Sequence, residues 1–363
     1  MATAQLRDLE VLRAGLTGWL RQAYPEVPSV TIEDLCHASA GWSNETLLVT
    51  IGTTGAGRAA VPVVPERVVV RLPPVRSSFP DGEDPARQGA LHAAVSAAGV
   101  PAPAPVTVVD DERWVGVPFL VMPFVPGHVP GQAPVLDPWV VESSVHQQRV
   151  LYEGFVDTVA AVNRIDWAAA GLGPIARGGE TPPGGVPGSL DAELDWWERY
   201  VAWSSDGVPL ADLDEALGWC GANRPGTKSA PSLLWGDARL GNLVVGDDRA
   251  VRAVLDWEMA SVGPAELDLG WFLALEWSMY ELIGRRVPGF PGRAETVARY
   301  EAGLGRPVAD LVWYEIFALV RALAISNRQA RMAAAVGARY AMPADERNPL
   351  LALVRRRVAD AGG

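Results

Sequence analysis

The sequence predicts an α+β protein with two lobes, in which a small antiparallel sheet comes first and a mainly helical region follows. Before residue 124, short β-branched segments alternate with Gly- and Pro-containing turns, as at residues 46–51, 67–71 and 117–122. After residue 138, long segments with a helical hydrophobic period dominate. A connector with two prolines and a glycine, residues 122–127, separates these regions. We therefore predict an N-terminal lobe of residues 1–123 and a C-terminal lobe of residues 124–363.

The composition is that of a globular protein and argues against several classes of function. Hydrophobic residues make up 49% of the 363 residues, and the most apolar segment, residues 312–325, contains Glu315 and Arg321, so we expect no membrane helix. The net charge of −12 argues against a general nucleic-acid binder. Two distant cysteines and four scattered histidines indicate neither a zinc site nor a redox pair. The N-terminal segment has acidic residues and no apolar signal core, so we expect a cytoplasmic protein.

The first lobe is expected to begin with an amphipathic helix at residues 4–23, where leucines recur at helical spacing. Residues 29–35 are predicted to be extended, and the segment Ala40-Gly41-Trp42-Ser43-Asn44-Glu45 leads into the strand at residues 46–51. A small residue and a glycine before a strand let the backbone approach phosphate groups. A plain β-turn is the alternative interpretation.

The next strand, residues 67–71, ends at Arg71 before two prolines. A helix with several alanines is predicted at residues 84–98 and contains Gln88. The alternating prolines of residues 100–105 require an extended chain. Strands at residues 106–110 and 117–122 then complete the small sheet.

The second lobe is predicted to consist mainly of helices, at residues 145–165, 190–203, 266–279, 293–302, 308–332 and 350–361. In the second of these, Trp196, Tyr200 and Trp203 follow each other at three- and four-residue spacing. This spacing is typical of core packing. The alternative is an apolar or aromatic wall of a binding pocket.

The segment LLWGDARLGNLVVGDDRAVRAVLDWE, residues 233–258, carries the strongest functional pattern. Two short apolar runs, residues 243–245 and 250–255, flank Gly-Asp-Asp-Arg, which predicts a β-hairpin. Asn242 precedes the first strand and Asp256 follows the second, so we expect their oxygens to converge. A carboxylate and an amide suit Mg²⁺, with Asp237 beside the metal.

The spacing Asp-x-x-x-x-Asn, followed after a strand pair by a further Asp, is that of a protein-kinase catalytic loop and its metal-binding aspartate. Together with Trp235-Gly236-Asp237, Asp256-Trp257-Glu258 and Gly263-Pro-Ala-Glu-Leu-Asp-Leu269, it resembles the aminoglycoside phosphotransferase and choline kinase-like family. The similarity is greatest to the branch related to kinase domains fused to acyl-CoA dehydrogenases. The resemblance implies a protein kinase-like fold with a small antiparallel-sheet N-lobe and a mainly helical C-lobe.

The resemblance also implies an ATP- or GTP-dependent transfer of phosphate to a small hydroxylated acceptor, with Asp237 as base and Asn242 and Asp256 as Mg²⁺ ligands. Arg239 would neutralise charge at the transferred group. If the aromatic residues at positions 196–203 form a pocket wall, they favour an apolar or aromatic acceptor over a polycationic aminoglycoside. Neither a nucleic acid nor a membrane is an expected partner. The nucleotide would contact residues of the first lobe, namely Gly41, Ser43, Asn44, Arg71, Gln88, Met122 and Phe124.

The sequence departs from the family pattern at several positions. Arg71 stands where kinases have a strand lysine, Gln88 where they have a helical glutamate, and Trp235 and Asn163 where this family usually has histidines. Asp268 matches a buried aspartate that binds catalytic-loop amides. Two alternatives to an active kinase remain, a nucleotide-binding pseudokinase that recognises a partner and an unrelated metal-dependent hydrolase.

Overall fold

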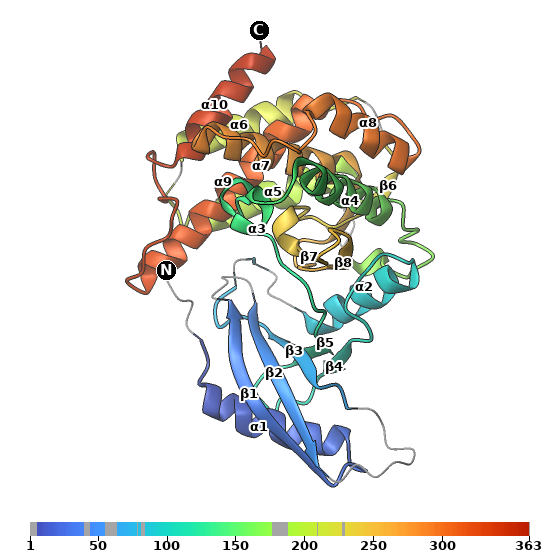
Figure 1. Cartoon of the computed structure of the whole chain (residues 1–363). Coiled ribbons are helices and arrows are strands. Elements are labelled where there is room, and N and C mark those ends of the chain that lie inside the picture. The colour runs from blue at the N-terminus through green and yellow to red at the C-terminus, as the bar shows by residue number, and fades with distance from the viewer. Residues whose placement is uncertain are drawn as a thin grey trace. The chain divides into compact units, whose positions relative to one another are not determined.

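The computed structural model describes residues 6–39, 44–54, 64–77, 79–80, 84–175, 188–208, 210–226 and 229–362. The chain forms two compact units (Figure 1). The first comprises Met1–Ala93 and Pro103–Val125, and the second comprises Ala94–Ala102 and Pro126–Gly363.

The first unit is built on a five-stranded antiparallel sheet with the strand order β1-β2-β3-β5-β4. Helix α1 (Leu9–Ala23), capped by the Asp8 side chain, lies along this sheet (Figure 1). Its buried leucines share one core with Val68, Val70 and Leu72. The strands are β1 (Ser29–Ser39), β2 (Glu45–Thr54), β3 (Arg67–Leu72), β4 (Thr107–Val109) and β5 (Phe119–Pro123).

Helix α2 (Pro85–Ala97) lies against the opposite face of the sheet. A Cβ on its Gly89 would lie 2.6 Å from Val108 and 3.7 Å from Leu120. Leu120 pairs in register with Arg71. Because neighbouring strand residues alternate between faces, and Val70 and Leu72 face α1, Arg71 lies on the face that α2 covers.

The second unit is mainly helical. Its helices are α3 (Pro138–Val141), α4 (Val145–Asn163), α5 (Leu190–Ser204), α6 (Ala211–Ala222), α7 (Glu266–Ile283), α8 (Arg293–Leu304), α9 (Leu311–Ala335) and α10 (Pro349–Gly362), with short 3₁₀ turns η1 (Pro134–Leu136), η2 (Gly173–Ile175) and η3 (Leu240–Asn242). Helix α9 contacts α5, α6, α7 and α10, and α4 contacts α8. Two antiparallel strand pairs complete this unit: β6 (Pro231–Leu234) with β9 (Ser261–Pro264), and β7 (Leu243–Val245) with β8 (Val251–Val254).

The predicted α+β class and the order of sheet and helices are confirmed. The aromatic segment in α5 belongs to the core, since Trp197 and Tyr200 are fully buried and Trp196 nearly so. Helix α6 and the β6-β9 pair were not predicted. Helix α6 contains Gly218 and Gly221, which weaken a helical pattern, and each strand of the pair has only four residues.

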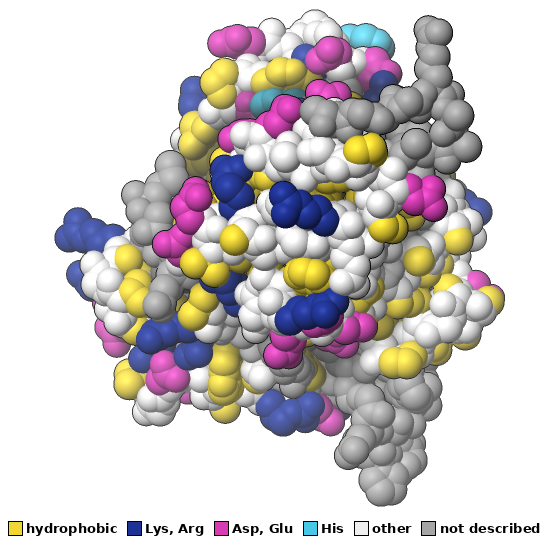
Figure 2. Space-filling model, turned by 90° about the horizontal axis from the view of Figure 1, so that it is seen from below, with side chains coloured by type: hydrophobic (Ala, Val, Ile, Leu, Met, Phe, Trp, Pro, Cys, Tyr) yellow, Lys and Arg dark blue, Asp and Glu magenta, His cyan; other side chains and the backbone are white. Residues whose placement is uncertain are grey.

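In the described part of the chain, no helix combines the length and apolar character needed to cross a membrane. On the face drawn in Figure 2, the described arginines are interspersed with acidic, apolar and uncharged side chains. This face therefore shows no continuous basic strip among its described residues.

Candidate active site

The β7-β8 hairpin brings two of the predicted site residues to one end. Leu243 pairs with Val254, and one step further the Leu255 N–H donates to the Asn242 carbonyl at 2.8 Å. Asp256 follows Leu255 directly. Asn242 and Asp256 therefore lie at the same end of the hairpin.

Asp237 is 4% exposed and lies in the loop between β6 and η3. The Trp271 Nε1–H donates to its Oδ1 at 3.0 Å. The Asn242 Nδ2 and an Arg239 guanidinium nitrogen approach its Oδ2 at 2.8 and 2.7 Å. A carboxylate offers about four acceptor positions, so Oδ1 retains capacity for one further hydrogen bond.

The orientation of the Asn242 amide follows from its partners. Its Nδ2 donates to the main-chain oxygen of Asp237 at 3.0 Å and to the Oδ2 of Asp237 at 2.8 Å. Both atoms accept hydrogen bonds, so the NH₂ group must face them and the amide oxygen is directed elsewhere. The Asn242 amide oxygen and the Asp256 carboxylate are oxygen ligands of the kind that Mg²⁺ prefers. Within the described ranges, no group of three or more His, Cys, Asp and Glu residues could hold a metal by itself.

Asp256 has a backbone φ of +59°, in the left-handed region. Residues other than glycine rarely adopt this conformation, although Asp and Asn tolerate it best. Its side chain is half-buried. Backbone strain of this kind persists where the surrounding structure enforces it, often at functional sites.

The buried carboxylate of Asp268 accepts hydrogen bonds from the loop that carries Asp237, as the resemblance implied. The Trp235 and Gly236 N–H groups donate to Asp268 at 2.8 Å each, and the Asn163 Nδ2 donates to it at 2.8 Å. Burial raises the pKa of Asp268, while these three hydrogen bonds and the Arg321 charge favour its ionised form. The predicted role of Asp268 is thus confirmed by geometry.

Trp235 joins the catalytic loop to the end of β8. It is fully buried, and its Nε1–H donates to the Leu255 carbonyl at 2.8 Å, directly before Asp256. Trp235 therefore connects the loop that carries Asp237 with the strand end that carries Asp256.

We expect Trp235→Phe to destabilise the protein by about 1–3 kcal/mol, because it removes a buried hydrogen bond and indole volume. Urea unfolding measures this change. Trp313→Phe is the matched control, since the Trp313 Nε1–H donates to the Cys220 carbonyl at 3.0 Å, outside the catalytic loop. Both variants should lose similar stability, but only Trp235→Phe should weaken the stabilisation by Mg·ATP that the family resemblance implies. Equal nucleotide responses of the two variants would contradict the connection that we assign to Trp235.

Arg239 is partly exposed and contacts both Asp237 and the Gln132 side chain. A guanidinium at this place can balance negative charge beside the Asp237 carboxylate. Gln132 comes from the segment just before η1, which the sequence analysis did not assign to the site.

Among the predicted nucleotide contacts, Gly41 and Ser43 lie outside the described residues. Asn44 is buried at the start of β2. Met122 is buried in β5, and the Phe124 N–H donates to the Arg67 carbonyl at 3.3 Å. The Arg67 guanidinium lies 3.6 Å from the centre of the Phe124 ring.

Arg71 lies on the face of the sheet that α2 covers, and Gln88 belongs to α2. Gln88 is 4% exposed, and His92, one helical turn further, is 1% exposed. Burial and, to a lesser extent, the Arg71 charge lower the pKa of His92 to about 4, so the imidazole is neutral. The described surroundings of Arg71 thus include a neutral histidine that the sequence analysis did not identify.

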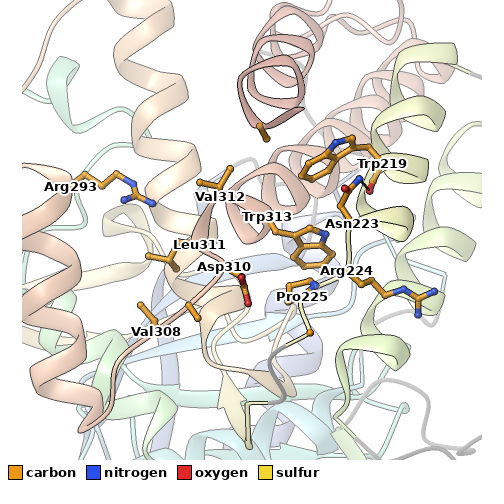
Figure 3. Close-up of a pocket in the computed structure, with 13 residues that line it drawn as sticks. Trp219, Asn223, Arg224, Pro225, Arg293, Val308, Asp310, Leu311, Val312 and Trp313 are labelled. Atoms are coloured by element: carbon orange, nitrogen blue, oxygen red, sulfur yellow. Dashed lines mark hydrogen bonds between the residues drawn. The ribbon is translucent and has the colours of Figure 1, made fainter. Parts of the chain in front are cut away.

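A surface hollow of about 580 Å³ lies elsewhere in the second unit (Figure 3). Trp219, Trp313 and Asp310 line it. Its two arginines have acidic partners, Arg224 with Asp191 and Arg293 with Glu315. It contains none of the residues that contact Asp237.

The chain is similar to a known family and to individual proteins. A family model described as "Phosphotransferase enzyme family" matches residues 34–311. "Acyl-CoA dehydrogenase family member 11" of Gallus gallus is 27% identical over 250 residues, which are 68% of this chain and 28% of that protein. The chain therefore spans less than a third of that relative's length.

Solved structures resemble the whole chain. A Ralstonia eutropha JMP134 protein, classed provisionally as an aminoglycoside phosphotransferase, has a TM-score of 0.70 at 21% identity, covering 95% of this chain and 98% of that one. The GDP complex of wild-type aminoglycoside 2'-phosphotransferase-IIIa has a TM-score of 0.57 at 14% identity, covering 96% and 99%. The chain therefore has the kinase-like α+β fold of these structures, as predicted.

Proposed function

The chain belongs to the phosphotransferase enzyme family, and we propose that it transfers the γ-phosphate of ATP or GTP to a hydroxyl group of a small molecule. The observation that carries this proposal is the burial and hydrogen bonding of the Asp237 carboxylate. This carboxylate is buried and held by three donors, yet one position on Oδ1 can accept a hydrogen bond from the acceptor hydroxyl.

In the proposed reaction, Asp237 orients the acceptor hydroxyl and takes its proton as the new oxygen–phosphorus bond forms. The bond between the γ-phosphorus and the bridging oxygen breaks, and the nucleoside diphosphate leaves. Phosphoryl transfer has a loose transition state, so the enzyme acts mainly by positioning and by balancing charge. Arg239, beside Asp237, would balance charge at the transferred group.

Asn242 and Asp256 would hold Mg²⁺, since both residues lie at one end of the hairpin and their side-chain oxygens suit this ion. When bound, the ion supplies charge neutralisation at the β- and γ-phosphates. In the first unit, Arg71 would bind phosphate oxygens and Gln88 would orient it, while Asn44 and the backbone from Met122 to Phe124 would contact the nucleotide. Gly41 and Ser43 complete the proposed nucleotide contacts. The GDP complex of a structural relative supports testing guanine as well as adenine nucleotides.

Thermal denaturation with and without Mg·ATP or Mg·GTP tests the first half of this proposal. We expect a raised melting temperature that requires both nucleotide and metal. A screen of hydroxylated metabolites, acyl-type alcohols and aminoglycosides with γ-labelled nucleotide tests the second half. Stabilisation without transfer to any acceptor would indicate a pseudokinase, and no response to either nucleotide would refute the proposed phosphotransfer.

We expect polycationic aminoglycosides to be poor acceptors. The side chains in contact with Asp237 are cationic or uncharged, namely Arg239, Asn242 and Trp271. Arg239 already pairs with the Asp237 carboxylate, so an ammonium group here would compete with Arg239 for that carboxylate, whereas a neutral alcohol would not. In the labelled-nucleotide screen, an aminoglycoside should therefore give less product than neutral alcohols, and efficient aminoglycoside phosphorylation would refute this prediction.

A further inference from the structure

A buried arginine lies where helices α5, α7 and α9 meet beneath the catalytic loop. Arg321 of α9 is 3% exposed. Its guanidinium carbon lies over two indole rings, 4.7 Å from the centre of Trp271 in α7 and 4.9 Å from that of Trp197 in α5. Gly270 allows α7 and α9 to approach closely, since a Cβ there would lie 2.8 Å from the Tyr314 backbone.

Arg321 is linked to the loop that carries Asp237 in two ways, by a hydrogen bond of its own and through the Trp271 ring. An Arg321 guanidinium nitrogen donates to the Gly236 carbonyl at 3.3 Å, directly before Asp237. The Trp271 ring beneath the guanidinium donates its Nε1–H to the Asp237 Oδ1 at 3.0 Å. Gly236 has a φ of +86°, and a Cβ there would lie 2.1 Å from the Met259 carbonyl oxygen. The backbone before Asp237 is thus confined by Met259 and held by Arg321.

A guanidinium is rarely buried without a carboxylate partner. In the described part of the chain, Arg321 forms no ion pair, and its Nε has no hydrogen-bond partner. Burial lowers the pKa of Arg321, while the charges of Glu193, Asp268 and Asp237 oppose that effect. The cation is therefore held by ring faces and by the field of three carboxylates, two of which belong to or support the catalytic loop.

We propose that Arg321 is a positioning residue for the phosphotransfer reaction, which fixes the Gly236 carbonyl and the Trp271 indole so that the Asp237 carboxylate faces the acceptor hydroxyl. This inference rests on the proposed function, in which Asp237 is the base. Arg321 lies 85 residues after Gly236 in the sequence, so the proposal gives helix α9 a part in the geometry of the loop that carries Asp237.

Arg321→Ala and Arg321→Lys test the proposal, with Arg328→Ala as the matched control. Arg328 also belongs to α9 and lies over an α5 indole, 4.0 Å from the Trp203 ring centre, but its ionic partner is Asp206. Arg321→Lys retains the charge and a comparable length, so it remains informative should the alanine variant fail to fold. With an acceptor in hand, we expect both Arg321 variants to lower kcat by about 10- to 100-fold, because a small misplacement of a reacting group has such effects.

The KM for Mg·ATP should change little in these variants, and added guanidinium ion at a non-denaturing concentration should restore part of kcat to Arg321→Ala. Arg328→Ala should behave like the parent protein. Hydrogen exchange of the Trp271 indole N–H, assigned with Trp271→Phe, should become faster in the Arg321 variants alone. This exchange measurement needs no acceptor, so it decides the inference even if the parent protein transfers no phosphate. Unchanged exchange in both Arg321 variants would overturn it, and so would parental kcat in both of them.

Discussion

Replacement of Asp237 by asparagine is expected to lower the rate of phosphoryl transfer by about 10²- to 10⁴-fold, the usual contribution of a positioned general base. The variant keeps the shape of the side chain but cannot take the hydroxyl proton. Binding of Mg·ATP should remain nearly intact, because the proposed metal and nucleotide contacts belong to other residues. Single-turnover assays with labelled nucleotide measure the transfer, and thermal shift measures the binding.

The hydrogen bonds around Asp237 predict that Asp237→Asn also changes the stability of the protein. Asn242 and Arg239 both donate to Oδ2, so the new amide oxygen should occupy that position. The new NH₂ group would then face the Trp271 Nε1–H, and two donors would meet in a buried place. Asp237→Asn should therefore also lose stability.

The double variant Asp237→Asn/Trp271→Phe separates stability from chemistry. Trp271→Phe removes the opposing N–H while it keeps an aromatic ring against Arg321. We expect the double variant to regain stability relative to Asp237→Asn but to remain inactive, and Trp271→Phe alone to lose part of the transfer activity, because it removes a hydrogen bond that orients Asp237. Recovery of transfer in the double variant would show that Asp237 acts through structure rather than as the base.

The sequence was sufficient to predict the hairpin and its end residues because both depend on local spacing. Asn242 and Leu255 become neighbours as soon as the turn residues between β7 and β8 close the hairpin. Asp268 could be predicted for a related reason, since it lies in the first turn of α7, directly after the strand paired with β6. Local chemistry and a family motif therefore defined the proposed catalytic residues.

The side chains that hold Asp237 could not be predicted in the same way. Trp271 lies within the helix predicted at residues 266–279, with no sign of a polar role, and Arg321 was identified only as a charge within an apolar segment. A signal was present, because a lone arginine in an otherwise buried helix needs compensating partners. Its partners, however, are the Gly236 carbonyl and rings from α5 and α7, and only the packing of three helices brings these together.

The aromatic segment of α5 shows that a sequence pattern can fit two different structures. Its helical spacing fitted both a packed core and a pocket wall. Trp197 and Tyr200 are fully buried, so these rings pack inside the second unit, where Trp197 lies against the Arg321 guanidinium. Burial, which the spacing alone does not determine, distinguishes the two interpretations.

The Asp256→Asn variant should abolish the metal-dependent part of nucleotide binding. An amide lacks the negative charge of the carboxylate, and we expect the apparent Mg²⁺ affinity in the presence of ATP to fall by at least about 100-fold, beyond the usual effect of residues that merely support metal ligands. Asparagine tolerates the left-handed backbone at this position, so the fold should be preserved. Magnesium titrations followed by thermal shift and by transfer of labelled phosphate provide the measurement.

Two further variants, Asp256→Gly and Asp248→Asn, test whether Asp256 is a metal ligand or is needed only for the backbone conformation at this position. Glycine relieves the strain of a φ of +59°, so Asp256→Gly should be at least as stable as the parent protein and yet fail to respond to Mg²⁺. Asp248 lies in the exposed turn of the same hairpin and pairs with Arg252, so Asp248→Asn should bind Mg·ATP normally. If Asp256→Gly responded to Mg²⁺ like the parent protein, the aspartate would be there for the turn, and the metal would have to be held by other oxygens. Loss of the response in both Asp256 variants but not in Asp248→Asn is the outcome that the hairpin geometry supports.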